Sequence, residues 1–347
     1  MVTLGSDCHK KTHTVVAVDE NGRELGSRTV QATSGGHLEA LSWAQRWAQR
    51  RWALENCRQL CRGLERDLLR VGEQVVLVSP RLMAGARRSG REQGKSDPID
   101  AQAVARAALR EPNLPVAQLE GRSRDVRLLL DHREDLVQER VKAQNRLRWH
   151  LHELAPGYEI PPRGLTRGNV LHRVSELLDQ HSGIVAELSK NLLAQIRELT
   201  VQINQLERRI ADLVKELAPS LLALHGCAAL TAAKIIGETA DISRFRSRAA
   251  FAMHNGTAPI PVWSGHRERF RLNRGGNRQL NAALHRIALT QIRPDGPGRD
   301  YYLHRLAIRD NKTEALRLLR RRISDEVYRR LWKDHLAAST NPADLAA

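Results

Sequence analysis

The fold is decided near the start of the chain, which reads VTLGSDCHKKTHTVVAVDENGRELGSRTVQ from residue 2 to residue 31. A short apolar segment at 2–6 is followed by THTVVAV at 12–18. Polar and apolar residues then alternate over 24–31, behind the turn Asn21-Gly22. Alternation on both sides of an Asn-Gly turn is typical of a β-hairpin. We therefore expect three consecutive antiparallel strands.

Helices and strands alternate after this hairpin. Residues 37–49 and 58–71 have the apolar spacing of helices, whereas 52–55 and 74–78 are short apolar strands. The second of these strands is stopped by Pro80. Three antiparallel strands followed by helix, strand, helix and strand predict an α/β fold.

Composition and charge restrict the function. The chain has 347 residues, 41% of them hydrophobic, with 56 Lys and Arg against 39 Asp and Glu and a formal net charge of +17. This length suits two or three domains, and the positive excess indicates a polyanionic partner, most simply nucleic acid. Four cysteines exclude a disulfide scaffold, and we favour buried thiols over a metal pair at Cys57 and Cys61. We expect no signal peptide, no membrane segment and a cytoplasmic, nucleoid-associated protein.

Breaks in the pattern divide the chain into four parts. Two prolines and a glycine at 111–122 mark the first boundary. We expect a catalytic domain at 1–115, long helices at 116–217, a mainly helical domain at 218–336, and a disordered tail at 337–347.

Residues 185–217 show the clearest periodicity. Isoleucine or leucine recurs every seven residues in two series, which are Ile196, Ile203, Ile210, Leu217 and Leu192, Leu199, Leu206, Leu213. This pattern is typical of a two-stranded parallel coiled coil. We therefore favour a coiled coil that pairs two chains. The alternative is that the helix folds back on a long amphipathic helix at 123–154 of the same chain.

Four acids stand at positions that favour a metal site. Asp7 and Glu55 end strands, while Asp97 and Asp100 are three residues apart around the start of a helix, with Asp97 as the expected N-cap before Pro98. Hard oxygen ligands of this kind suit one or two Mg²⁺ ions, which serve phosphoryl transfer. Each acid taken singly also has a structural explanation, such as helix capping or an ion pair.

The carboxy-terminal part is rich in arginine. Seven Arg and a single acid, Glu268, lie between Val262 and Arg293, and Gly275-Gly276-Asn277 permits a close backbone approach. This imbalance indicates phosphate contacts rather than a merely solvated face. We expect a loop at 258–276, and at 224–234 a hairpin that leads into a helix.

These segments resemble a known family. GSDCHKKTHTVVAVDENGREL, WALEN and GKSDPIDAQAVARA look like the amino-terminal domain of the DEDD-type insertion-sequence transposases. LHGCAALTAAKIIGETADISRFRSRAAFAMHNGTAPIPVWSG and LNRGGNRQLNAALHRIA are similar to the family's carboxy-terminal domain. The resemblance extends from about Leu4 to about Arg293. The chain departs from the family pattern after Glu55, where the second position is Cys57 rather than glycine, and at Ala228, which replaces a second hairpin glycine.

The resemblance implies a fold, an activity and partners. The first domain should be ribonuclease-H/RuvC-like, with Asp7, Glu55, Asp97 and Asp100 as the Mg²⁺ ligands. Ser264 should be the nucleophile that forms a covalent link to DNA, activated by the metal site or by His266. The partners should be donor DNA, target DNA and an element-encoded bridge RNA, with a homodimer that assembles into a tetramer. We expect nucleic-acid contacts from Lys10, Arg87, Arg88, Lys95, Gly265, Arg267, Arg269, Arg271, Arg274, Asn277 and Arg278.

Two other functions compete with RNA-guided recombination. A junction-resolving nuclease would use the acids alone and hydrolyse DNA with water. A coiled-coil nucleic-acid-binding protein would have no activity that depends on the acids.

Overall fold

The computed structural model describes residues 1–55, 60–80, 82–83, 96–111, 114–117, 121–264, 267–308 and 311–339. The chain forms two compact units, Met1–Leu119 and Glu120–Ala347. The break lies close to the expected boundary at residue 115. A finer division of the second unit at residue 217 remains a proposal. Among the described residues, no helix combines the length and the apolar character needed to cross a membrane.

A five-stranded sheet forms the centre of the first unit. Its strands are β1 (Val2–Cys8), β2 (Thr12–Val18), β3 (Glu24–Gln31), β4 (Arg50–Glu55) and β5 (Val75–Val78), in the spatial order β3-β2-β1-β4-β5. The first three strands are antiparallel, whereas β4 is parallel to both β1 and β5. This confirms the expected ribonuclease-H-like α/β arrangement.

Helices cover both faces of this sheet. Leu4, Trp52 and Leu54 are fully buried in a cluster shared with α1 (Ser34–Ala44) and α2 (Arg62–Arg70). The neighbouring residues Ala53 and Val76 face the other way and are buried with α4 (Asp97–Arg110). Since successive side chains of a strand point to opposite faces, odd-numbered residues of β1 and β4 lie on the α4 side.

The second unit is mainly helical, as expected. Its helices are α5 (Arg122–Leu154), η1 (Gly164–Thr166), α6 (Gly168–Asp179), α7 (Ile184–Leu217), α8 (Pro219–Leu222), α9 (Ala229–Thr239), η2 (Ile242–Arg244), α10 (Arg248–His254), α11 (Arg278–Gln291), α12 (Pro297–Ala307) and α13 (Lys312–Ser339). A turn at Gly226, whose φ is 84°, precedes α9, and the hairpin expected at 224–234 stays a prediction. The helix α13 includes residues 337–339, which we had assigned to a disordered tail.

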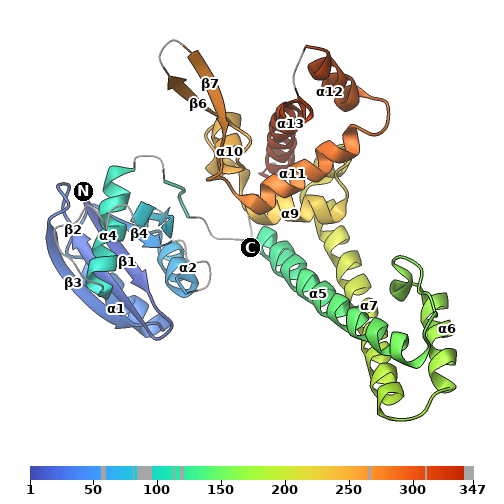
Figure 1. Cartoon of the computed structure of the whole chain (residues 1–347). Coiled ribbons are helices and arrows are strands. Elements are labelled where there is room, and N and C mark those ends of the chain that lie inside the picture. Colours follow the sequence, from blue (N-terminus) through green and yellow to red (C-terminus); the bar gives the residue numbers. More distant parts are fainter. Residues whose placement is uncertain are drawn as a thin grey trace. The chain divides into compact units, whose positions relative to one another are not determined.

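The heptad stripe of α7 is filled by the same chain. Ile210 and Val214 are buried with Val126 of α5, whereas Ile196 is buried with Leu147. The two helices therefore lie side by side in opposite directions (Figure 1). The expected parallel pairing between chains is wrong for this stripe, because α5 occupies its isoleucine positions. The alternative in which the helix folds back on 123–154 is correct.

The loop expected at 258–276 contains a β-hairpin. Strand β6 (Pro259–Ser264) pairs with the antiparallel strand β7 (Arg267–Leu272), and the two form a separate ribbon (Figure 1). We assigned a loop because of Pro259 and Pro261. A two-stranded ribbon has unpaired outer edges, so it accepts prolines that a central strand would not.

Candidate active site

The strand β1 brings Asp7 to the α4 side of the sheet. Two residues earlier, Gly5 touches α4 so closely that a Cβ on it would lie 2.2 Å from the carbonyl oxygen of Ala101. Because residues two apart share a face of a strand, Asp7 lies on this same side. The residue is buried, with 6% of its surface exposed.

Glu55 reaches the same end of the sheet from β4. The parallel register places Ser6 opposite Leu54, so the next residues along the two strands are Asp7 and Glu55. Glu55 lies two residues after Ala53 and therefore on the same face of β4, and Ala53 is buried against α4. Two carboxylates from neighbouring strands therefore share one edge and one face.

The helix α4 supplies the other two acids. Asp97 and Asp100 occupy its first turn, in line with Ala101, Ala105 and the rest of the alanine-rich stripe that packs on the sheet. Asp100 is 9% exposed, whereas Asp97 is largely exposed. The N-cap is Ser96, so our assignment of the cap to Asp97 was wrong by one residue. A helix N-terminus favours carboxylates, which stabilises both acids in this turn.

His9 completes the cluster and was not among the predicted site residues. Its Nε2 lies 3.7 Å from Oδ2 of Asp7 and 3.6 Å from Oδ1 of Asp97. One ligand atom each from Asp7, His9 and Asp97 fall within 4.8 Å of one another. The sequence signal was the spacing Asp7-x-His9, because residues two apart at a strand end point to the same side.

The electrostatics of Asp7 fit a cation site. Burial raises the pKa of Asp7 to about 6, His9 opposes this shift, and the charges of Asp100, Asp97 and Glu55 add to it. Within the described residues, the buried Oδ2 of Asp7 has no hydrogen-bond partner. A buried carboxylate oxygen without a donor, surrounded by further acids, suits a divalent ion that prefers oxygen ligands.

The predicted nucleic-acid contacts are scattered through the chain. Lys10 is exposed in the turn between β1 and β2, and Arg271, Arg274 and Arg278 are exposed in the second unit. Asn277 caps α11, because its Oδ1 accepts a hydrogen bond from the amide of Leu280 and its Nδ2 donates to Glu238. Ser264 ends β6, where the backbone pairs it with Arg267, and Arg269 lies in β7. Arg87, Arg88, Lys95, Gly265 and His266 lie outside the described residues.

Two family profiles match the chain. A DEDD-type transposase profile matches residues 4–156, which include all four acids, and the profile described as "Transposase IS116/IS110/IS902 family" matches residues 218–303, which include Ser264. The two matches follow one another along the chain in the order that the resemblance predicted.

Individual proteins agree with these profiles. An uncharacterised protein of insertion element IS116 from Streptomyces clavuligerus is 26% identical over 100% of this chain and 98% of its own length. The transposase of insertion sequence element IS1328 from Yersinia enterocolitica is 27% identical over 61% of this chain and 62% of its own.

Solved structures of RuvC are also similar. T. thermophilus RuvC in complex with a Holliday junction substrate has a TM-score of 0.28 and 16% identity, with coverage of 34% of this chain and 99% of that one. A second Thermus thermophilus RuvC structure has a TM-score of 0.26 and 18% identity, with coverage of 31% of this chain and 92% of the RuvC chain. On the two profiles and the full-length relative, the chain belongs to the DEDD-type IS116/IS110/IS902 family of insertion-sequence transposases, which are enzymes that act on DNA.

Proposed function

We propose that this transposase is an RNA-guided DNA recombinase that cleaves and exchanges strands with Ser264 as nucleophile and the acidic cluster as a Mg²⁺ site. The observation that carries the proposal is the convergence of acids from β1, β4 and α4 around one buried carboxylate oxygen of Asp7, which accepts no hydrogen bond within the described residues. Such a cluster is repulsive on its own account, and packing alone does not explain it.

Asp7, Glu55, Asp97 and Asp100 are the residues that would hold the metal. A divalent ion bound there supplies Lewis-acid stabilisation of charge on a phosphodiester. Asp7 is fixed by its place in the sheet, whereas Asp97 is exposed and accessible to a substrate phosphate. The Nε2 of His9 lies 3.7 Å from Asp7 and 3.6 Å from Asp97, so His9 bridges these two carboxylates.

Ser264 supplies the covalent step in this proposal. Its Oγ would attack phosphorus and form an O–P bond, and the P–O bond to the departing deoxyribose oxygen would break. That oxygen takes up a proton, and the serine hydroxyl loses one. Support comes from the family match over 218–303 and from the backbone, which presents Ser264 at the end of a hairpin. We propose that the serine of one protomer works beside the acids of another, in a dimer that assembles into a tetramer.

Guidance by RNA would divide recognition between protein and base pairing. Exposed arginines such as Arg271, Arg274 and Arg278 suit phosphate contacts, which position a duplex without reading its sequence. Pairing between a bridge RNA and the donor and target DNA would then supply sequence specificity.

The test uses the full chain with guide RNA and DNA that carries the element junction. Ser264→Ala should eliminate a protein–DNA adduct that survives denaturing electrophoresis, together with strand exchange. Asp7→Asn should eliminate cleavage, whereas Asp212→Asn, which changes an exposed acid of α7, should act like the wild type.

A junction-resolving nuclease is the second candidate, since the whole acidic cluster lies within the first unit. Cleavage that persists in Ser264→Ala without an adduct would favour this nuclease and refute the serine mechanism. If Asp7→Asn leaves cleavage intact, both proposals for the acids are wrong.

A further inference from the structure

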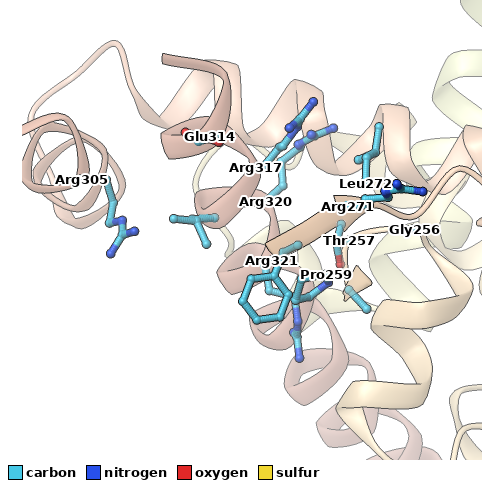
Figure 2. Close-up of a pocket in the computed structure, with 13 residues that line it drawn as sticks. Gly256, Thr257, Pro259, Arg271, Leu272, Arg305, Glu314, Arg317, Arg320 and Arg321 are labelled. Carbon is cyan, nitrogen blue, oxygen red and sulfur yellow. The ribbon is translucent and has the colours of Figure 1, made fainter. Parts of the chain in front are cut away.

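A cavity of about 290 Å³ is lined by residues of the second unit, whereas the acids belong to the first. One side is formed by the hairpin, through Pro259 and Leu272, and the other by arginines of α12 and α13 (Figure 2). Phe270 of the hairpin also lines the cavity. None of its arginines from these two helices was among the predicted site residues.

The hairpin contributes an apolar and accessible surface to the cavity, next to Arg271. Phe270 is 63% exposed and Leu272 is 43% exposed. Across the ribbon they pair with Pro261 and Pro259, so the apolar surface continues over both strands. An aromatic ring left open beside a cavity is available to stack on a planar ligand.

The helical side carries an excess of positive charge. Arg317 and Arg320 of α13 extend toward the same part of the cavity (Figure 2). Arg320 donates from Nη1 to Asn281, whereas its buried Nε has no partner within the described residues. Burial, and then the charge of Arg317, lower the pKa of Arg320.

Few acids in the described lining offset this charge. Arg305 and Arg321 also line the cavity, and Glu314 is the acid among the described lining residues. Arg321 is already paired with Asp325, and Glu314 accepts a hydrogen bond from Asn311. The cavity therefore combines an open aromatic side with closely spaced guanidinium groups, and such groups bind phosphate.

We propose that this cavity binds one nucleotide of a single-stranded nucleic acid, with its base against Phe270 and Leu272 and its phosphate on Arg317 and Arg320. Its volume lies near the lower end of the roughly 300–1,000 Å³ of small-molecule sites, which suits one nucleotide and is too small for a duplex. Aromatic stacking together with cationic phosphate contacts is the general mode of single-strand binding.

This inference rests on the proposed function only in taking the ligand to be nucleic acid. The strand that it holds would be an unpaired nucleotide of the guide or of separated DNA. These two sources share their chemistry, and separate arms of the test distinguish them.

The test measures fluorescence anisotropy of the full chain with labelled strands of about twelve nucleotides, one of thymidine and one of uridine. An abasic strand of the same length and a DNA duplex are the comparison ligands. Phe270→Ala should weaken binding of both base-bearing strands roughly tenfold and leave the abasic strand unchanged. Phe270→Tyr should restore binding. A preference between the thymidine and uridine strands identifies the source.

Arg317→Ala should weaken all single strands and make the slope of log affinity against log salt shallower by about 0.7. Lys333→Ala, which changes an exposed cation of α13 outside the cavity, should have no such effect. Unchanged melting temperatures would show that the variants fold, since Phe270 and Arg317 are both exposed.

Wild-type affinity for single strands in both Phe270→Ala and Arg317→Ala would overturn the proposal. An equal loss for the thymidine and abasic strands in Phe270→Ala would also overturn it, because the ring would not be contacting a base. Neither result affects the tests with Asp7→Asn and Ser264→Ala, so the two proposals can fail separately.

Discussion

Replacement of Gly5 by alanine should disable the acidic site without contacting any acid. Gly5 is the point at which α4 rests on β1, and α4 carries Asp97 and Asp100. A Cβ at this position would lie 2.2 Å from the oxygen of Ala101, and 2.5 Å from the nitrogen of Ala105. Both atoms are backbone, so no flexible side chain can move aside.

The size of the effect follows from these distances. Ordinary contact with a Cβ begins at 3.4 Å, so α4 must move away from β1 by about 1 Å. Asp97 and Asp100 would move with the helix, whereas Asp7 would stay in the sheet. A displacement of about 1 Å in a catalytic constellation costs on the order of 100-fold in rate. Overpacking of this kind also costs about 1–3 kcal/mol of stability.

Two measurements on the same preparations test this reasoning. Cleavage of junction DNA should fall on the order of 100-fold in Gly5→Ala, and urea denaturation should give a free energy of unfolding that is lower by about 1–3 kcal/mol. Gly168→Ala is the matched control, because a Cβ there meets nothing within 4 Å and it should match the wild type in both assays. Wild-type cleavage by Gly5→Ala would refute the view that contact between β1 and α4 sets the acid geometry.

Other parts of the chain give sharper tests of stability than of activity. His13 is 1% exposed and burial lowers its pKa to about 4, so the unfolded state binds the proton first as the pH falls below 6.5. The free energy of unfolding should therefore drop by up to about 3 kcal/mol between pH 6.5 and 4, and His13→Gln should reduce this slope in urea denaturation. Lys234 is 5% exposed and its Nζ lies 2.9 Å from Glu134, so Lys234→Met should lower the free energy of unfolding by about 1–3 kcal/mol. Because this loss comes from the carboxylate left unpaired, the double variant with Glu134→Gln should recover part of it. Burial raises the pKa of the Cys227 thiol to about 12. After iodoacetamide treatment of the folded protein at mildly alkaline pH, peptide mass spectrometry should therefore find Cys227 unmodified. Rapid alkylation of Cys227 would contradict its burial.

The sequence was most informative where local pattern and topology agree. Asp7 and Glu55 were predictable because apolar strands end at acids, and parallel strands bring those ends to one edge. Asp97 and Asp100 were predictable from their spacing before a run of alanines. The pattern of the four acids did not predict His9, which precedes two lysines. Its distance to Asp97 depends on α4, which lies far along the chain.

Two elements of the second unit show what periodicity cannot decide. The heptads of α7 specify an apolar stripe but not the helix that covers it, because α5 of the same chain and α7 of a second chain offer similar side chains. The choice depends on the connection through α6, which returns the chain beside α5. The strands β6 and β7 were missed because prolines and arginines are poor strand signals. Their pairing depends on the close approach of Gly256 and Gly276, where a Cβ on Gly276 would lie 2.3 Å from the nitrogen of Gly256.

The acidic cluster is held together against its own repulsion by the packing around it. Leu4 and Leu54 are fully buried on one face of the sheet, and the contact of Gly5 with α4 fixes the other. The sheet and α4 therefore hold the carboxylates close together, and His9, a proton or a cation can relieve the repulsion. Because the pKa of Asp7 is about 6, this carboxyl is mostly ionised at pH 7, so its protonation relieves only a small part of the repulsion. We therefore expect a divalent cation to stabilise the first unit against unfolding. Folding brings the acids together against their repulsion, and a cation that relieves this repulsion binds the folded unit more tightly than the unfolded chain.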